Sequence, residues 1–145
     1  MFRLASNPDD PTAAPPGRGI TPLIDMLALE DAADRLARSA HAADAAIERA
    51  AALPPATQAR IDASLADIDQ LLLDPRGLPG RPWYQNLIYA PGTLTGYGAK
   101  TLPGVREGIE QRRFEDAQTY VARTAVVLGA YAERLDAAVA LAKGG

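Results

Sequence analysis

The sequence feature that most constrains the fold is a segment rich in proline and glycine that separates two regions of helical pattern. Residues 73–104 contain five prolines, six glycines and four aromatic residues. Proline and glycine disfavour helix, so no long helix can pass through this segment. A loop of this length inside a small domain usually has a function. We therefore expect residues 73–104 to form an ordered loop that is the working part of the protein.

The regions on both sides of this loop have the apolar spacing of helices that pack in a bundle. Within residues 29–50, 61–72 and 114–139, apolar side chains recur in alternating steps of four and three, which is a heptad pattern. Alanine is abundant and aromatic residues make up only 6% of the chain, a composition that favours helix. The pattern predicts an all-α protein.

Local signals mark the expected ends of these helices. Thr21 and Pro22 are favoured at the N-cap and at the first helical position, so we expect the first long helix to begin there. Pro54 and Pro55 end that helix, because a residue before proline is pushed out of the helical region. The second helix is expected to start near Pro55 and to run to Asp74.

The last helix is predicted over residues 115–142, after a short helical turn at residues 105–109. Its large apolar residues fall on two faces, with Phe114, Val121 and Leu128 on the first and Tyr120, Val127 and Tyr131 on the second. A helix that is apolar on more than one face is central or contacts a partner. We expect the first face to enter the bundle core and the second to remain for a partner.

Together these signals predict an up-and-down helical bundle of about four helices with a long ordered loop before the last helices. Prolines and glycines are closely spaced in residues 1–20, so we expect a flexible N-terminal arm there. Residues 21–145 are then expected to form a single helical domain. Residues 86–89 give a strand-like pattern, and it is short.

Composition argues against several classes of function. The net charge is −3 and the basic residues are scattered among acidic ones, whereas a nucleic-acid-binding protein should show a basic face. No apolar run reaches the roughly 20 residues that span a bilayer, so we expect no membrane contact by this segment. The chain has one histidine, His41, and no cysteine, so we expect neither a metal site nor a catalytic residue of its own.

The loop also contains a series of short motifs that occur in a fixed order. These are Asp74-Pro75, Gly77-Leu78-Pro79, Arg81-Pro82, Trp83-Tyr84, Ile88-Tyr89-Ala90-Pro91 and Pro103-Gly104. In this order they resemble the C-terminal helical domain of the glutamate carboxypeptidase II and transferrin receptor family, the transferrin receptor-like dimerisation domain. The last helix is similar to the final helix of that domain, more weakly.

The resemblance implies a domain that acts by association. In that family the domain follows a protease-like domain that holds two zinc ions, packs on it and forms a two-fold homodimer. The chain would then be the non-catalytic C-terminal dimerisation domain of a glutamate carboxypeptidase-like zinc metallopeptidase. Zinc would be bound by the protease-like domain, which is missing here, and this chain would hold no cofactor. The localisation is left unknown by the sequence, and the resemblance is compatible with a parent exopeptidase that is exported or membrane-anchored.

The resemblance also implies a site residue. In the glutamate carboxypeptidase branch, a Lys-Tyr pair in this loop lines the substrate pocket and grips the C-terminal carboxylates of the substrate. Tyr97 stands at the position of the tyrosine, whereas Gly96 replaces the lysine and Lys100 lies a few residues later. Because a glycine cannot supply the cation for a second carboxylate, the resemblance does not carry over a preference for C-terminal glutamate.

Several other aromatic residues are candidate anchors of the loop or of an interface, because large aromatic side chains dominate such contacts. They are Trp83, Tyr84, Tyr89, Tyr120 and Tyr131. Two alternative functions remain open. The same domain could belong to a transferrin receptor-like parent without peptidase activity, or the chain could be an independent helical protein-interaction module that shares only the loop.

Overall fold

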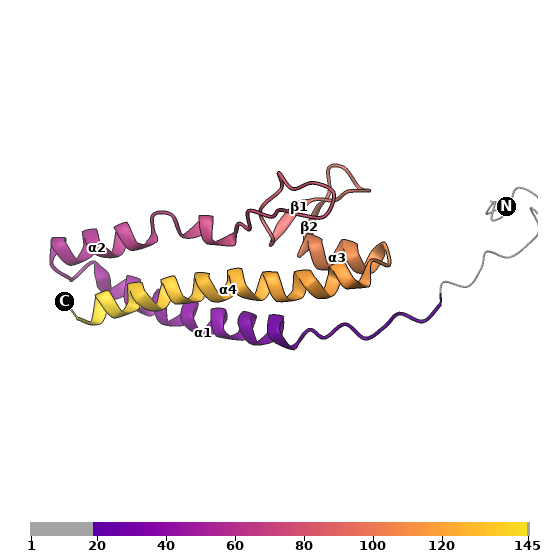
Figure 1. The fold of residues 1–145 in the computed structure, drawn as a ribbon. Coiled ribbons are helices and arrows are strands. Elements are labelled where there is room, and N and C mark those ends of the chain that lie inside the picture. The colour runs from indigo at the N-terminus through magenta and orange to yellow at the C-terminus, as the bar shows by residue number, and fades with distance from the viewer. Residues whose placement is uncertain (1–18, 145) are drawn as a thin grey trace, which may run out of the picture.

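The protein forms an elongated helical bundle in a computed structural model that describes residues 19–144 (Figure 1). Its elements in chain order are helices α1 (Leu27–Ala50) and α2 (Pro55–Leu65), the 3-10 helix η1 (Ile68–Leu72), strands β1 (Tyr89–Pro91) and β2 (Ala99–Thr101), and helices α3 (Pro103–Glu110) and α4 (Phe114–Lys143). The predicted all-α fold class is confirmed, with a small antiparallel two-stranded sheet added inside the loop.

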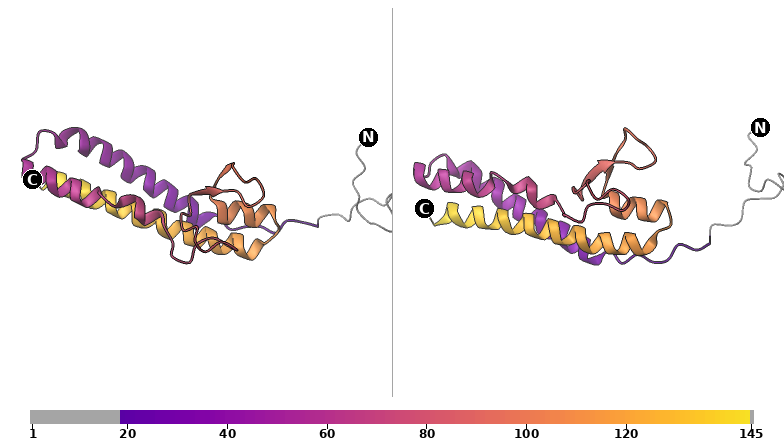
Figure 2. Two further views of the ribbon diagram at one scale, coloured as in Figure 1. Left: turned by 90° about the horizontal axis from the view of Figure 1, so that it is seen from above. Right: turned by 45° about the horizontal axis from the view of Figure 1, so that its top comes forward.

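Helix α4 is the axis on which the other elements pack. It runs along the bundle between α1 on one side and α2 with η1 on the other, while α3 and the hairpin lie at its N-terminal end (Figures 1 and 2). Its bounds differ by one residue from the prediction at each end. The predicted first face is turned inward, since Val121 is buried and Phe114 and Leu128 are half-buried. The predicted short helical turn at residues 105–109 is α3.

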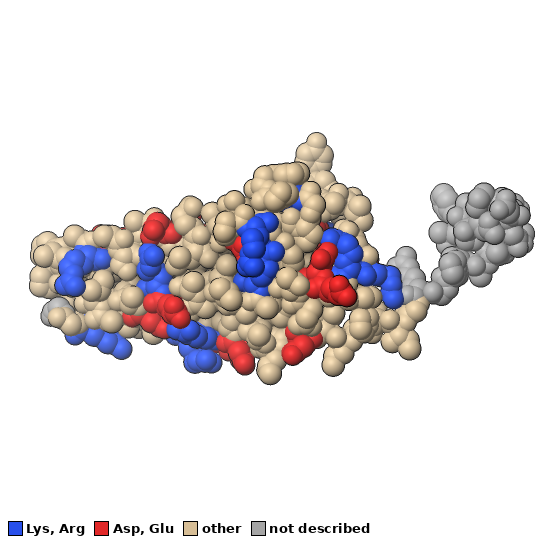
Figure 3. Space-filling view, viewed as in Figure 1, with Lys and Arg blue, Asp and Glu red and all other residues tan. Residues whose placement is uncertain are grey.

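Charged side chains lie on the outside of this bundle in mixed order. On the face shown in Figure 3, acidic and basic groups alternate along the helices without forming a broad region of one sign. Among the described helices, none combines the length and the apolar composition that crossing a membrane requires.

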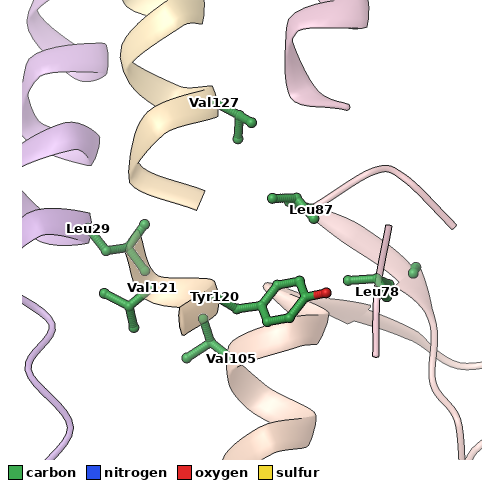
Figure 4. Close-up of a cluster of buried hydrophobic side chains, with 8 residues drawn as sticks. Leu29, Leu78, Leu87, Val105, Tyr120, Val121 and Val127 are labelled. Atoms are coloured by element: carbon green, nitrogen blue, oxygen red, sulfur yellow. The ribbon is translucent and has the colours of Figure 1, made fainter. Parts of the chain in front are cut away.

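Two clusters of buried apolar side chains form the core. The first lies at the loop end of the bundle and joins α1, the loop, α3 and α4 (Figure 4). Its buried members are Leu29, Leu78, Leu87, Ala90, Val105, Tyr120, Val121 and Val127. The second lies toward the other end and is built from smaller residues, Ala43, Ala46, Leu135 and Val139.

The second face of α4 is covered by the chain's own loop, which differs from the prediction. Tyr120 and Val127 are 6% exposed and pack in the first cluster, which Leu78 and Leu87 of the loop also enter. Tyr131 is half-buried at the edge of the second cluster. The expectation that this face remains for a partner is therefore wrong for Tyr120 and Val127. Helical periodicity identifies an apolar face and does not identify the segment that covers it.

Helix α1 begins at Leu27, six residues later than Thr21, where it was predicted to start. The side-chain amide of Gln118 pairs with both the N–H and the carbonyl of Asp25, at 2.9 and 3.0 Å. The carboxylate of Asp25 in turn accepts a hydrogen bond from the N–H of Leu27 at 3.0 Å. This pairing with α4 holds the segment before Leu27 out of the helix. The arm expected over residues 1–20 lies outside the described residues, except for its last two.

The predicted single helix over residues 55–74 is divided in two. Helix α2 starts at Pro55 as predicted but ends at Leu65, and η1 follows after a break at Asp67. Arg134 of α4 donates to the carbonyl of Ser64 at 2.9 Å and to the carboxylate of Asp67 at 2.6 Å. A continued helix would use that carbonyl to accept from the N–H of Ile68. The contact with α4 therefore favours the break.

Candidate functional site: the loop between η1 and α3

The beginning of the loop is fixed by a buried carboxylate. Asp74 accepts hydrogen bonds from the guanidinium of Arg76 at 2.8 and 3.0 Å and from Arg123 of α4 at 2.9 Å. The hydrogen bonds from Arg76 and then Arg123 hold the pKa of the Asp74 carboxyl well below its usual range, although burial acts in the opposite direction. Asp74 therefore remains ionised and ties the loop to α4.

The next turn is held from α4 through the carbonyl of Gly77. The hydroxyl of Tyr120 and the guanidinium of Arg123 both donate to this carbonyl, the latter at 3.1 Å. Gly77 has a φ of +61°, and a Cβ at this position would lie 2.1 Å from the carbonyl oxygen of Pro82. Only glycine fits such a turn without a shift of the backbone. Tyr120 thus joins α4 to the loop by a hydrogen bond, and its burial raises the pKa of the hydroxyl.

The centre of the loop contains a second buried ion pair. Arg81 and Glu107 of α3 lie 2.7 Å apart, with their side chains 10% and 3% exposed. Arg81 also donates to the carbonyl of Pro91. Glu107 accepts from both the backbone N–H and the hydroxyl of Thr93, at 2.8 and 2.9 Å. The pair therefore contacts the hairpin on both sides of Gly92.

The hairpin β1–β2 carries the most exposed part of the loop. Tyr89 pairs with Thr101 and Pro91 with Ala99, and residues 92–98 form the tip. The tip is closed by backbone hydrogen bonds, including one from the N–H of Gly92 to the carbonyl of Gly98 at 2.9 Å. It projects away from the helices in the views of Figures 1 and 2.

Tyr97, the predicted substrate-pocket residue, is fully exposed on this tip. Leu94 is also exposed, at 78%. Lys100 is the single basic residue of residues 92–101. Its side chain is only 12% exposed, and its ammonium is paired with Glu110 of α3. The tip thus presents an apolar side chain and a phenol, and the nearby cation of Lys100 is already paired.

The predicted aromatic anchors divide into two groups. Tyr120 is buried, and Tyr84 and Tyr131 are half-buried against the two core clusters. Trp83 is 73% exposed and Tyr89 is 59% exposed. Tyr84 and Tyr120 therefore both pack in or against the first cluster, and their role as loop anchors stays a prediction. A role of these five residues in an interface stays a prediction.

The charged residues that organise the loop were not predicted from the sequence. Asp74, Arg81, Glu107 and Arg123 have buried or nearly buried side chains, and each joins the loop to a helix. One available signal was the occurrence of Asp74 and Arg81 inside a segment otherwise rich in proline, glycine and apolar residues. Charged side chains in such a setting are rarely buried unless they are paired.

No metal site emerges among residues 19–144, since no three His, Cys, Asp or Glu side chains come close enough to hold an ion. His41 is exposed on α1.

An apolar groove runs between α1, η1 and α4, next to the second cluster. Its lining includes Leu36, Ile47, Leu72, Leu128 and Tyr131.

Known proteins resemble this chain over the same region. Residues 24–136 match the family described as the transferrin receptor-like dimerisation domain. A probable glutamate carboxypeptidase of Arabidopsis thaliana is 42% identical over 45 residues, which is 31% of this chain and 7% of the relative. A probable glutamate carboxypeptidase of Arthroderma benhamiae is 43% identical over 47 residues, 32% of this chain and 6% of the relative.

A third relative is an inactive zinc metalloprotease of Schizosaccharomyces pombe, 34% identical over 67 residues, which is 46% of this chain and 8% of that protein. The aligned segments thus span less than a tenth of the length of these curated relatives. The family match covers most of the described residues, including all of the loop and α3. The chain belongs to the transferrin receptor-like dimerisation domain family.

Proposed function

We propose that this chain is the non-catalytic dimerisation domain of a glutamate carboxypeptidase-like zinc metallopeptidase and that it brings two copies of the parent protein together. The observation that carries the proposal is a loop that is fixed to the bundle by buried ion pairs and yet exposes large side chains, among them Trp83 and Leu94. Exposed aromatic side chains on a rigid support are typical anchors of a protein interface.

The second part of the proposal concerns the substrate. We assign the tip of the hairpin to one wall of the substrate pocket of the parent, with Tyr97 as the contacting residue. Its exposed phenol can donate a hydrogen bond to a substrate carboxylate. Since Lys100 is paired with Glu110, the tip offers no unpaired cation of its own to an acidic side chain. We therefore expect substrates whose terminal side chain is uncharged.

The proposal assigns zinc to a protease-like domain outside the described residues. Zinc in peptidases is held by several His, Asp or Glu ligands that converge on one point. Such a domain would bind the metal and carry out hydrolysis, while this domain would supply association and the pocket wall. Its partners would then be that protease-like domain and a second copy of the parent.

Sedimentation equilibrium of the purified chain, alone and mixed with a glutamate carboxypeptidase-like protease domain, tests the first part. We expect weak self-association alone, because a stable interface needs about 800 Å² from each partner and part of it would come from the protease-like domain. A two-fold dimer is expected in the mixture, and Trp83→Ala should weaken it. A strict monomer under both conditions would overturn the proposed dimerisation.

Peptide hydrolysis by the same mixture tests the second part. Tyr97→Ala should raise KM and leave the dimer intact, because Tyr97 makes contact only with solvent in this domain. Turnover by the chain alone would contradict a non-catalytic role.

A second candidate is the same association domain on a parent without peptidase activity. It is favoured by the similarity to the inactive zinc metalloprotease of Schizosaccharomyces pombe, which extends over more of the chain than the two carboxypeptidase alignments. Dimerisation without turnover in the mixture would favour this candidate.

A further inference from the structure

The exposed tip of the hairpin is tied to one helix at both of its ends. Thr93, where the tip begins, donates twice to the carboxylate of Glu107. Lys100, in the strand after the tip, is paired with Glu110. Glu107 and Glu110 are three residues apart on α3, so they lie on one side of that helix. Helix α3 thus presents two carboxylates, one helical turn apart, to the first residues of the tip and to β2.

Of these two contacts, the one between Thr93 and Glu107 is the stronger. Glu107 is buried and shares its carboxylate between Thr93 and Arg81, and Arg81 in turn donates to the carbonyl of Pro91. Charge-assisted hydrogen bonds are stronger in a buried setting than near the surface, and Glu110 is 40% exposed whereas Glu107 is 3% exposed. The residues before and after Gly92 are therefore both held by one buried ion pair.

The backbone of the tip is closely packed around Gly92. A Cβ added at Gly92 would lie 2.2 Å from the hydroxyl oxygen of Thr95 and 3.0 Å from a methylene of Lys100. The N–H of Gly96 donates to the carbonyl of Gly92 at 3.1 Å. The seven-residue tip is thus closed on itself immediately beyond the point where Glu107 holds it.

We infer that Glu107 is a positioning residue: with Arg81 it fixes the tip on α3, so that Leu94 and Tyr97 are set in place before any partner or substrate arrives. A site preorganised in this way avoids the entropy loss of ordering a loop on binding. The role of the tip in a substrate pocket rests on the proposed function, whereas the fixed position of the tip does not.

Distance measurements between two spin labels test the inference on the chain itself. The chain contains no cysteine, so Tyr97→Cys and Ala137→Cys give two unique labelling sites. Both residues are exposed, the first on the tip and the second on α4. Double electron–electron resonance should give a single narrow distance distribution. Glu107→Gln should broaden it at least about twofold, because the tip loses the charged acceptor that holds Thr93.

Two further variants separate positioning from stability. Thr93→Val removes the hydroxyl tie and leaves the pair of Arg81 and Glu107 in place, so it should broaden the distribution while lowering the thermal midpoint less than Glu107→Gln does. Glu48→Gln, an exposed carboxylate on α1, is the matched control and should change neither. A broad distribution in the labelled background, or a width unaffected by Thr93→Val, would overturn the inference.

Enzyme kinetics on the mixture with the protease-like domain distinguish the two proposals. If the tip is narrow and Thr93→Val raises KM without changing kcat, both are supported. If the tip is narrow but Tyr97→Ala leaves KM unchanged, the pocket role fails and the positioning by Glu107 stands. If the tip is broad and Tyr97→Ala raises KM, the positioning fails and the pocket role stands.

Discussion

The two ends of this bundle are held together by different means. At the end of the second cluster, helices α1, α2 and α4 meet through alanines and a few larger aliphatic residues, such as Leu135 and Val139. At the loop end, large side chains are combined with buried ion pairs, of which Arg81–Glu107 is the most enclosed. Regular helices satisfy their own backbone groups, so a simple apolar seam is enough to join them.

An irregular loop pairs only part of its backbone internally, and its remaining polar backbone groups must find partners elsewhere. Here several of these partners are side chains. Arg123 and Tyr120 reach the carbonyl of Gly77, Arg81 reaches that of Pro91, and Glu107 accepts from the N–H of Thr93. Polar and charged side chains at the loop end therefore supply hydrogen bonds to backbone groups that the hairpin and the turns leave unpaired.

The largest expected effect comes from removing one partner of the buried ion pair. Glu107→Ala leaves Arg81 buried without its carboxylate, and breaking such a pair costs about 3–5 kcal/mol. The matched control is Glu133→Ala, which breaks the exposed contact with Arg35 and should cost about 0–1 kcal/mol. Urea unfolding of both variants measures the two free energies. Equal losses would show that the loop end does not depend on its buried charges.

A smaller loss is expected when an apolar side chain is truncated at the loop end. Leu87 is 1% exposed, so Leu87→Ala creates a cavity and should lower the free energy of unfolding by about 3 kcal/mol. Ile47, at 52% exposure beside the second cluster, is the comparison, and Ile47→Ala should cost less than about 1 kcal/mol. The reverse order in thermal or urea unfolding would mean that the loop is not part of the core.

The helices of the bundle could be predicted from the sequence more fully than the contacts at the loop end. The seam of α4, the start of α2 at Pro55 and the position of α3 follow from apolar spacing and proline, because these are local signals. The start of α1 and the break at Asp67 do not, since they depend on Gln118 and Arg134 of α4, which lie far away in the chain. The loop was expected to be ordered, and it is. The charged residues that order it pair across up to 49 residues, which no local pattern contains.

Acid should weaken the loop end through Asp74. Folding lowers the pKa of this carboxyl below its ordinary value of 3.8, so the unfolded chain takes up its proton first as the pH falls. The resulting stabilisation is complete above that ordinary value and is lost progressively below it. Asp74→Asn should cost about 1.5–3 kcal/mol at pH 7, where hydrogen bonds to a charged group are lost.

The same variant should flatten the dependence of stability on pH below about pH 4, because the group that titrates is absent. Chemical unfolding at a series of pH values from neutral to acid measures this slope. Asp69→Asn, which changes an exposed carboxylate on η1, is the control. An unchanged slope in Asp74→Asn would show that Asp74 has no special role in acid unfolding.

The smallest predicted effect is the loss of a tyrosine hydroxyl, which we compare at two tyrosines on one face of α4. Tyr120 donates its hydroxyl to the carbonyl of Gly77 and is 6% exposed, so Tyr120→Phe leaves that carbonyl with only Arg123 and should cost about 1 kcal/mol. Tyr131 lies eleven residues later, half-buried beside the groove of the second cluster, where its ring supplies the packing. Tyr131→Phe should therefore change the free energy of unfolding by less than about 0.5 kcal/mol. Each of the two variants removes one oxygen atom and keeps the aromatic ring on the same helix. If both variants lose the same amount, the hydroxyl of Tyr120 is not a tether of the loop, and the polar fixation of the loop end would rest on Arg81, Glu107, Asp74 and Arg123 alone.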